Sequence, residues 1–242
     1  MTLDVRIIAC LTDNYGFLVR DAETGSVACI DTPDAQAILA DLELSGWGRL
    51  DLILNTHWHP DHTQGNAAVR AATGCMVFGP AEVERVAPLD RVLTGADRVE
   101  LGATTFEVVE APGHTLGHVM FHAVAARMAF VGDVIFPLGC GRLFEGTPEQ
   151  MWTSLSRVAT WDDATMLWAA HDYLEGNSRF ALSVDDRPEL AAHVEEMLAR
   201  RARGRPTVPT TVEVERRFNP FLTAGDAPTF AARRAAKDVY RG

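Results

Sequence analysis

The sequence predicts an α/β protein that ends in a small all-α domain. Short apolar runs of strand-like composition alternate with turns and helical stretches over the first 172 residues. After about Tyr173 this alternation stops, and amphipathic helical patterns take its place. The charge changes as well, because residues 1–174 hold 23 acidic and 10 basic side chains, whereas residues 175–242 hold 10 acidic and 12 basic ones. This asymmetry suggests separate roles for the two parts of the chain.

Nine segments of the first part are predicted to be strands, since they are rich in β-branched and other apolar residues and are bounded by turn residues. Several are apolar throughout, which is typical of strands that are buried on both faces. In chain order the predicted strands are Val5–Leu11, Phe17–Arg20, Val27–Asp31, Leu50–Asn55, Met76–Gly79, Thr104–Glu110, His118–Ala123, Met128–Gly132 and Thr165–Ala169.

Five segments have the periodicity or the start signals of helices. They are Pro33–Ser45, Pro148–Thr160, Arg187–Arg203, a segment that starts at Thr210, and Thr229–Tyr240. Thr147 precedes the second helix and places proline at its first position, where a missing N–H costs nothing. Thr210 and Glu213 have the spacing of a capping box. Arg187–Arg203 has one apolar face and a basic C-terminal end, which complements the helix dipole.

Composition excludes several classes of protein. The 242 residues carry 33 acidic and 22 basic side chains, and a net charge of −11 argues against a nucleic-acid partner. No apolar run approaches the roughly 20 residues that span a bilayer, and the N-terminus lacks the pattern of a secretion signal. We therefore expect a cytoplasmic protein without a membrane partner, and we expect a monomer. All basic residues but Lys237 are arginines, which base composition alone could explain.

The four cysteines predict neither a disulfide framework nor a zinc knuckle. They are Cys10, Cys29, Cys75 and Cys140, which are widely spaced and form no C-x-x-C pair. Buried thiols in a reducing compartment are the expected role.

The strongest chemical signal is the segment His57-Trp58-His59-Pro60-Asp61-His62, which directly follows the apolar run at residues 50–54. Several buried titratable groups are costly unless something pairs with them, and a metal ion does so. Alternate side chains of an extended segment share a face, so His57 and His59 can bind one ion together. If a helix starts at Pro60, Asp61 and His62 point elsewhere and can reach a second ion.

Polar residues follow three more of the predicted strands. His114 follows the strand at 104–110, Asp133 follows the strand at 128–132, and His171 follows the strand at 165–169. Strand ends in α/β proteins gather ligands from distant parts of the chain. A single histidine in such a place is more often structural, and only the combination with the His57–His62 segment favours a shared metal site.

The motifs together resemble the hydroxyacylglutathione hydrolases (glyoxalase II) of the metallo-β-lactamase superfamily. They are Asp13-Asn14-Tyr15, the segment that ends in Asp61-His62, PGHTLGH, GDVIF, GCGRLFEGT, AAHDY and Asn219-Pro220-Phe221-Leu222. The resemblance implies an αββα sandwich of two mixed sheets at residues 1–172. It also implies a helical substrate-binding domain at residues 173–242.

The resemblance also implies a complete set of ligands for two metal ions. His57, His59 and His114 would hold the first ion, and Asp61, His62 and His171 would hold the second. Asp133 would bridge both. Zinc suits these ligands, and nitrogen and carboxylate donors also accept iron or manganese. His118 is left over, and we expect it to be structural or to support a ligand.

The implied reaction is the hydrolysis of S-D-lactoylglutathione to glutathione and D-lactate, in the detoxification of methylglyoxal. A hydroxide held between the two ions would attack the thioester carbonyl carbon, with Asp61 orienting it, and the thiolate would leave without a dedicated general acid. Asp61 and Asp133 are thus the predicted catalytic residues. An acyl-enzyme route through Cys140 is the competing mechanism.

The substrate carries two carboxylates, so its pocket needs cations. By motif, the resemblance assigns this role to Arg142, Arg234 and Lys237, and it assigns a substrate contact to Tyr173. Phe144 stands where many relatives have tyrosine, so that contact lacks a hydroxyl donor. Thr223 stands where relatives often have arginine. Without the family pattern, Arg234 and Lys237 would be interpreted as a solvated helix end.

Other activities of the same fold remain as alternatives. A glutathione-persulfide dioxygenase would use a single iron, although such relatives generally lack so long a helical C-terminal part. A hydrolase of a different thioester is also compatible with the motifs. A β-lactamase or an RNA-processing nuclease fits the His57–His62 segment alone, and a non-catalytic descendant would be expected to have lost a ligand.

Overall fold

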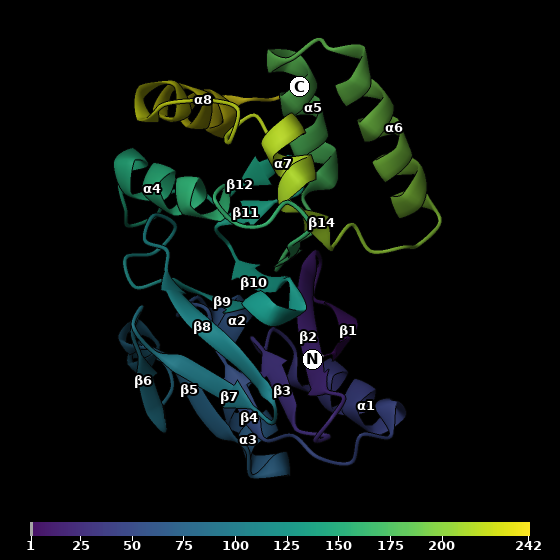
Figure 1. Cartoon of the computed structure of the whole chain (residues 1–242), viewed down its shortest axis with the longest axis vertical. Coiled ribbons are helices and arrows are strands. Elements are labelled where there is room, and N and C mark those ends of the chain that lie inside the picture. The colour runs from purple at the N-terminus through teal and green to yellow at the C-terminus, as the bar shows by residue number, and fades with distance from the viewer. Residues whose placement is uncertain (1) are drawn as a thin grey trace. The chain divides into compact units, whose positions relative to one another are not determined.

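The computed structural model describes residues 2–242, which form two compact units (Figure 1). The first unit comprises residues 2–110 and 117–132, and the second comprises residues 111–116 and 133–242. Each unit contains its own strands and helices. Within residues 2–242, no helix has the length and apolar character needed to cross a bilayer.

A six-stranded mixed sheet organises the first unit. Its strands lie in chain order: β1 (Leu3–Cys10), β2 (Asn14–Asp21), β3 (Val27–Ile30), β4 (Leu52–Leu54), β5 (Met76–Pro80) and β6 (Arg91–Leu93). The first three strands are antiparallel neighbours, and β3 to β6 are parallel neighbours. Parallel strands need crossover connections. Helices α1 (Ala35–Ser45) and α3 (Asn66–Thr73) provide the crossovers from β3 to β4 and from β4 to β5.

The end signals of α1 explain where this helix begins and ends. The carboxylate of Asp34 accepts hydrogen bonds from the backbone N–H groups of Gln36 and Ala37, and Gly46 ends the helix at φ 67. The helix buries Ile38 and Leu42 in a core that also contains residues of β1 to β5. Full burial of one such side chain contributes roughly 1.5–3 kcal/mol.

A second, antiparallel group of strands completes the first unit. It runs in the order β10 (Met128–Gly132), β9 (Val119–Ala123), β8 (Thr104–Glu110), β7 (Arg98–Leu101). The ring of Phe130 on β10 lies 5.5 Å from Phe17 on β2, so side chains from the two sheets share a core. Thr104 donates to Asp21 across the same layers at 2.7 Å. This packing confirms the predicted sheet-on-sheet sandwich.

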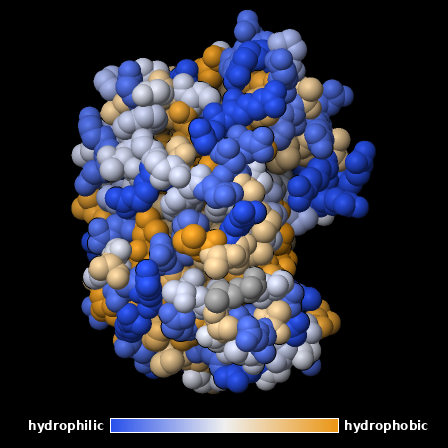
Figure 2. Space-filling model, viewed as in Figure 1, coloured by the Kyte–Doolittle hydropathy of each residue, from blue (hydrophilic) through white to orange (hydrophobic). Residues whose placement is uncertain are grey.

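The second unit holds most of the helices. Its elements are α4 (Pro148–Val158), α5 (Leu174–Val184), α6 (Pro188–Ala202), α7 (Val212–Phe218), α8 (Ala227–Val239), and the short strands β11 (Ile135–Phe136), β12 (Gly139–Cys140), β13 (Met166–Ala169) and β14 (Thr210–Thr211). Helix α4 begins with a capping box between Thr147 and Gln150, and Trp152 on this helix packs on Phe230 of α8. Leu190 and Val194 of α6 share a core with Leu174 of α5. The opposite face of α6 is hydrophilic (Figure 2).

The structure confirms the predicted α/β class and the five predicted helices, with shifts of a few residues at their ends. Sequence reasoning missed α5, because Gly176 and Asn177 lower its helix propensity. It also missed the two-residue strands β11 and β12, because Pro137 and the glycines near it indicate a turn. The division at residue 173 stays a prediction, since the second compact unit extends to both sides of it.

Candidate metal centre

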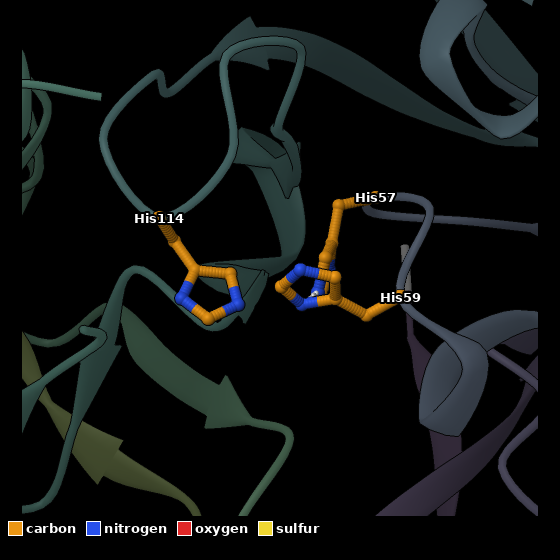
Figure 3. Close-up of side chains that lie close together, drawn as sticks. All are labelled: His57, His59 and His114. Carbon is orange, nitrogen blue, oxygen red and sulfur yellow. Dashed lines mark hydrogen bonds between the residues drawn. The ribbon is translucent and has the colours of Figure 1, made fainter. Parts of the chain in front are cut away.

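The histidine-rich loop lies directly after β4 in the first unit. His57 is buried, and its Nε2 lies 3.0 Å from Nδ1 of His59, so the two rings present nitrogen atoms to each other (Figure 3). Pro60 then begins the short helix α2 (Pro60–Thr63), as the sequence predicts. That turn brings Oδ2 of Asp61 to 3.7 Å from Nε2 of the buried His62. The four side chains predicted to be ligands therefore lie together within this unit.

A buried carboxylate, Asp31, orients this loop. Its Oδ2 accepts hydrogen bonds from Nδ1 of His62 and from the hydroxyl of Thr56, both at 2.8 Å. The Thr56 oxygen lies 3.0 Å from Nδ1 of His57 and, since its only hydrogen points at Asp31, accepts the proton on that nitrogen. Nδ1 of both histidines thus carries hydrogen, so Nε2 is the nitrogen whose lone pair would bind a metal ion.

Sequence reasoning did not assign a role to Asp31, although Asp31 is the last residue of a predicted strand. Its φ of 54 places it in the left-handed region, which aspartate tolerates better than most residues. Asn14, from the Asp13-Asn14-Tyr15 motif, supports another predicted ligand, because its Nδ2 donates to Oδ2 of Asp61 at 3.0 Å. His118 stacks on His57 with ring centroids 4.8 Å apart.

The second unit brings together the other three predicted ligands. Asp133 lies between two buried histidines, with Oδ2 3.4 Å from Nε2 of His114 and Oδ1 3.4 Å from Nε2 of His171. His114, the third ring labelled in Figure 3, donates from Nδ1 to the backbone carbonyl of Arg142 at 2.9 Å. Its Nε2 is therefore the nitrogen available to a metal ion. One carboxylate with an imidazole at each oxygen has the form of a bridging ligand.

Aromatic rings cover these ligands in the second unit. The ring of Tyr173 stacks on that of His171, with centroids 4.7 Å apart and planes 9° apart. Phe144 meets His114 edge to face at 5.3 Å and is 63% exposed. Both aromatic side chains of the predicted substrate set thus lie next to predicted ligands, and the exposed ring of Phe144 offers an apolar surface without a hydroxyl group.

The three predicted cations are close to one another and differ in exposure. Arg142 is exposed, Lys237 is half-buried, and Arg234 is only 5% exposed. Burial, together with the positive charges of Arg234, Arg179 and Arg142, lowers the pKa of Lys237 to about 8. A cluster of cations in an acidic protein is a place where an anion would be stabilised.

Arg234 has partners within the protein. One Nη donates to the carbonyl of Cys140 at 3.0 Å, and the other donates to Asp238 at 2.9 Å. Its guanidinium group also lies 5.0 Å from the ring centre of Phe221. Arg234 therefore supplies charge to the cluster while its hydrogen bonds hold the surrounding structure.

Cys140 does not have the properties of a nucleophile. Burial raises the pKa of this thiol to about 11, more than the nearby Arg234 lowers it, and the thiolate is the reactive form. His122 and His193 take no part in either set of ligands. Burial lowers the pKa of both, and His193 stacks on Phe218 at 4.9 Å.

Comparison with known proteins agrees with these features. Residues 28–183 match the model of the metallo-beta-lactamase superfamily, so the chain has the fold of that class. Residues 172–240 match the model of the hydroxyacylglutathione hydrolase C-terminus. The chain is 47% identical to the hydroxyacylglutathione hydrolase of Erythrobacter litoralis (strain HTCC2594), over 98% of this chain and 100% of the relative. The chain is 46% identical to the hydroxyacylglutathione hydrolase of Hyphomonas neptunium (strain ATCC 15444), over 98% of this chain and 98% of the relative. The chain belongs to the hydroxyacylglutathione hydrolase family.

Solved structures at lower identity show the same fold. ETHE1 from Myxococcus xanthus aligns with a TM-score of 0.75 over 98% of this chain and 92% of its own, at 24% identity. TTHA1623, solved in a di-iron-bound form, aligns with a TM-score of 0.66 over 90% of this chain and 100% of its own, at 23% identity.

Proposed function

We propose that this protein binds two divalent metal ions and hydrolyses S-D-lactoylglutathione to glutathione and D-lactate. The observation that carries the proposal is the identity of 42–47% to several hydroxyacylglutathione hydrolases, including one matched over its whole length. As a member of that family, the chain is an enzyme that hydrolyses glutathione thioesters. The match at residues 172–240 favours this activity over a persulfide dioxygenase.

The donor chemistry supports two metal ions. By their motifs, His57, His59 and His114 would hold one ion, and Asp61, His62 and His171 would hold the other. Asp133, which has an imidazole at each carboxylate oxygen, would bridge the two ions. Imidazole and carboxylate donors without sulfur suit zinc, and they also accept iron or manganese. The di-iron form of TTHA1623 makes iron a reasonable alternative to zinc.

The ions, when bound, would supply an acidified water molecule and a polarised thioester carbonyl. The protein's own groups would do the rest. Asp31, Thr56 and the carbonyl of Arg142 keep the proton of His62, His57 and His114 on Nδ1, so that Nε2 is the nitrogen that would bind a metal ion. Asp61, held by Asn14, would orient the attacking water. A thiol of pKa about 8.5 leaves as the thiolate, so no side chain needs to protonate it.

The cation cluster would bind the carboxylates of the substrate. Arg142 and Lys237 would contact them directly, and the buried Arg234 would add its positive charge. Phe144 and Tyr173 would flank the acyl group, since both rings lie against histidines of the proposed centre. The chain has a net charge of −11, but positive charges lie close together at Lys237. This local positive charge complements the two carboxylates of the substrate.

The proposal is tested by the metal content of the purified protein and by thiol release from S-D-lactoylglutathione. We expect two ions per chain, and thiol release that stops on chelation and returns with zinc. Asp133→Ala should lose both metal and activity. Oxygen consumption with glutathione persulfide and no thiol release from the thioester would contradict the proposal. Other glutathione thioesters, measured in parallel, would define the preferred acyl group.

A further inference from the structure

A small hairpin lies between the predicted ligand Asp133 and Arg142, whose carbonyl holds His114. Strands β11 and β12 pair only through Ile135 with Cys140 and Phe136 with Gly139. Every residue from 134 to 140 is buried. Buried backbone N–H and C=O groups need hydrogen-bond partners, and so short a ladder leaves several of them to be satisfied by other groups.

Side chains from the C-terminal helices satisfy this backbone. Asn219, at the end of α7, donates from Nδ2 to the carbonyls of Phe136 at 3.2 Å and Gly139 at 2.9 Å. Asn177 of α5 donates to the carbonyl of Pro137 at 3.2 Å. Arg234 of α8 donates to the carbonyl of Cys140 at 3.0 Å. Three helices thus hold the hairpin by its carbonyl groups.

Glu215 of α7 holds the hairpin from its N–H side. Its Oε2 accepts from the backbone N–H of Leu138 at 2.9 Å and from Nδ2 of Asn219, also at 2.9 Å. Its Oε1 accepts from the hydroxyl of Thr210 at 2.6 Å. Leu138 is in the left-handed region at φ 58, which is uncommon for leucine and is kept only when the surroundings require it. Glu215 and Asn219 thus form one connected, fully buried pair.

The hairpin is in direct contact with the predicted ligands. Gly141 packs so closely on the backbone of Asp133 that an added Cβ would lie 2.0 Å from the Asp133 carbonyl oxygen and 3.1 Å from Nδ1 of His114. His114 donates to the carbonyl of the next residue, Arg142. A shift of the hairpin would therefore move both the Asp133 backbone and the acceptor that orients His114.

We propose that Asn219 and Glu215 are positioning residues for the metal centre. They fix the hairpin at residues 135–140 and thereby the places of Asp133 and His114. This inference rests on the proposed metal centre, and it gives Asn219 of the Asn219-Pro220-Phe221-Leu222 motif a role in holding the hairpin. Partners that orient metal ligands typically change metal affinity by 10-fold to 100-fold when they are removed.

The test compares zinc affinity, measured by competition with a chromophoric chelator, in folded variants of the full chain. Asn219→Ala removes the donor to both carbonyls and should weaken zinc binding by 10-fold or more. Glu215→Ala should do the same. Glu215→Gln can keep all three hydrogen bonds, because its amide oxygen accepts two of them and its NH₂ group donates to Thr210, so its affinity should stay within about twofold of the wild type.

A control separates positioning from general loss of stability. Leu42→Ala truncates a core side chain of the first unit and should lower the melting temperature while leaving zinc affinity unchanged. Wild-type affinity in both Asn219→Ala and Glu215→Ala, or an equal loss in Leu42→Ala, would overturn the positioning role. If Asn219→Ala does not fold, the difference in zinc affinity between Glu215→Ala and Glu215→Gln tests the positioning role. A wild-type chain that binds no zinc, or binds it without hydrolysing the thioester, would instead overturn the proposed function.

Discussion

Replacing Glu215 with glutamine should stabilise the protein at pH 8 and leave its stability nearly unchanged near pH 4.5. Glu215 is fully buried, and burial raises the pKa of its carboxyl group from 4.5 to about 7, although hydrogen bonds from Thr210, Asn219 and Leu138 favour the charged form. The folded state therefore prefers the neutral carboxyl group. Between pH 4.5 and 7 the unfolded chain has lost this proton while the folded chain retains it, so stability falls as the pH rises.

The size of the effect follows from the pKa difference. Each pKa unit corresponds to about 1.4 kcal/mol, so a rise from 4.5 to about 7 corresponds to about 3 kcal/mol by pH 8. Glutamine avoids this cost because it never ionises. For a chain of this size, 1 kcal/mol shifts the melting temperature by roughly 2–4 °C, so the gain of Glu215→Gln should approach roughly 6–12 °C at pH 8.

The assay is the difference in melting temperature between Glu215→Gln and the wild type at pH 4.5, 6, 7 and 8. Both proteins share every other titrating group, so the other contributions to the pH dependence cancel. Glu213→Gln, on the exposed side of the same helix, is the matched control, because it makes the same substitution where the side chain is exposed. A difference that stays constant from pH 4.5 to 8 would refute the reasoning, since it would mean that burial does not hold the Glu215 proton.

Three further results are expected. Asp31→Asn should weaken zinc binding by 10-fold to 100-fold in chelator competition, because the amide replaces the charged acceptor for His62 Nδ1, and unchanged affinity would contradict that role. Lys237→Met should raise the KM for S-D-lactoylglutathione with little change in kcat, and the wild-type KM should rise as the pH passes about 8 because the ammonium group then loses its proton. Lys237→Arg should abolish that rise. Cys140→Ala should keep the wild-type kcat, because a thiol of pKa about 11 is not a nucleophile at neutral pH, and an inactive variant would favour an acyl-enzyme.

The sequence by itself determined the predicted ligands and the local structure that presents them. An extended segment followed by a proline at the start of a helix is enough to place His57 beside His59 and to start the helix that carries Asp61 and His62, because these are neighbours in the chain. The expectation that His62 points away from His57 is wrong, because the folded loop brings their ring centroids to 4.0 Å. The strand ends that carry His114, Asp133 and His171 were found by their apolar runs. The family resemblance, and with it the class of reaction, followed from such short motifs.

Only the tertiary structure decided which groups hold those ligands in place. The hydrogen bonds that hold them join residues far apart in the sequence. The separation is 31 residues for Asp31 and His62, 83 for Asn219 and Phe136, and 94 for Arg234 and Cys140. No local pattern indicates such pairs, because they depend on which buried backbone and side-chain groups lack a partner once the chain has packed. For the same reason the sequence analysis assigned no strand to residues 135–140, where the fold builds a buried hairpin and supplies its hydrogen bonds from three distant helices.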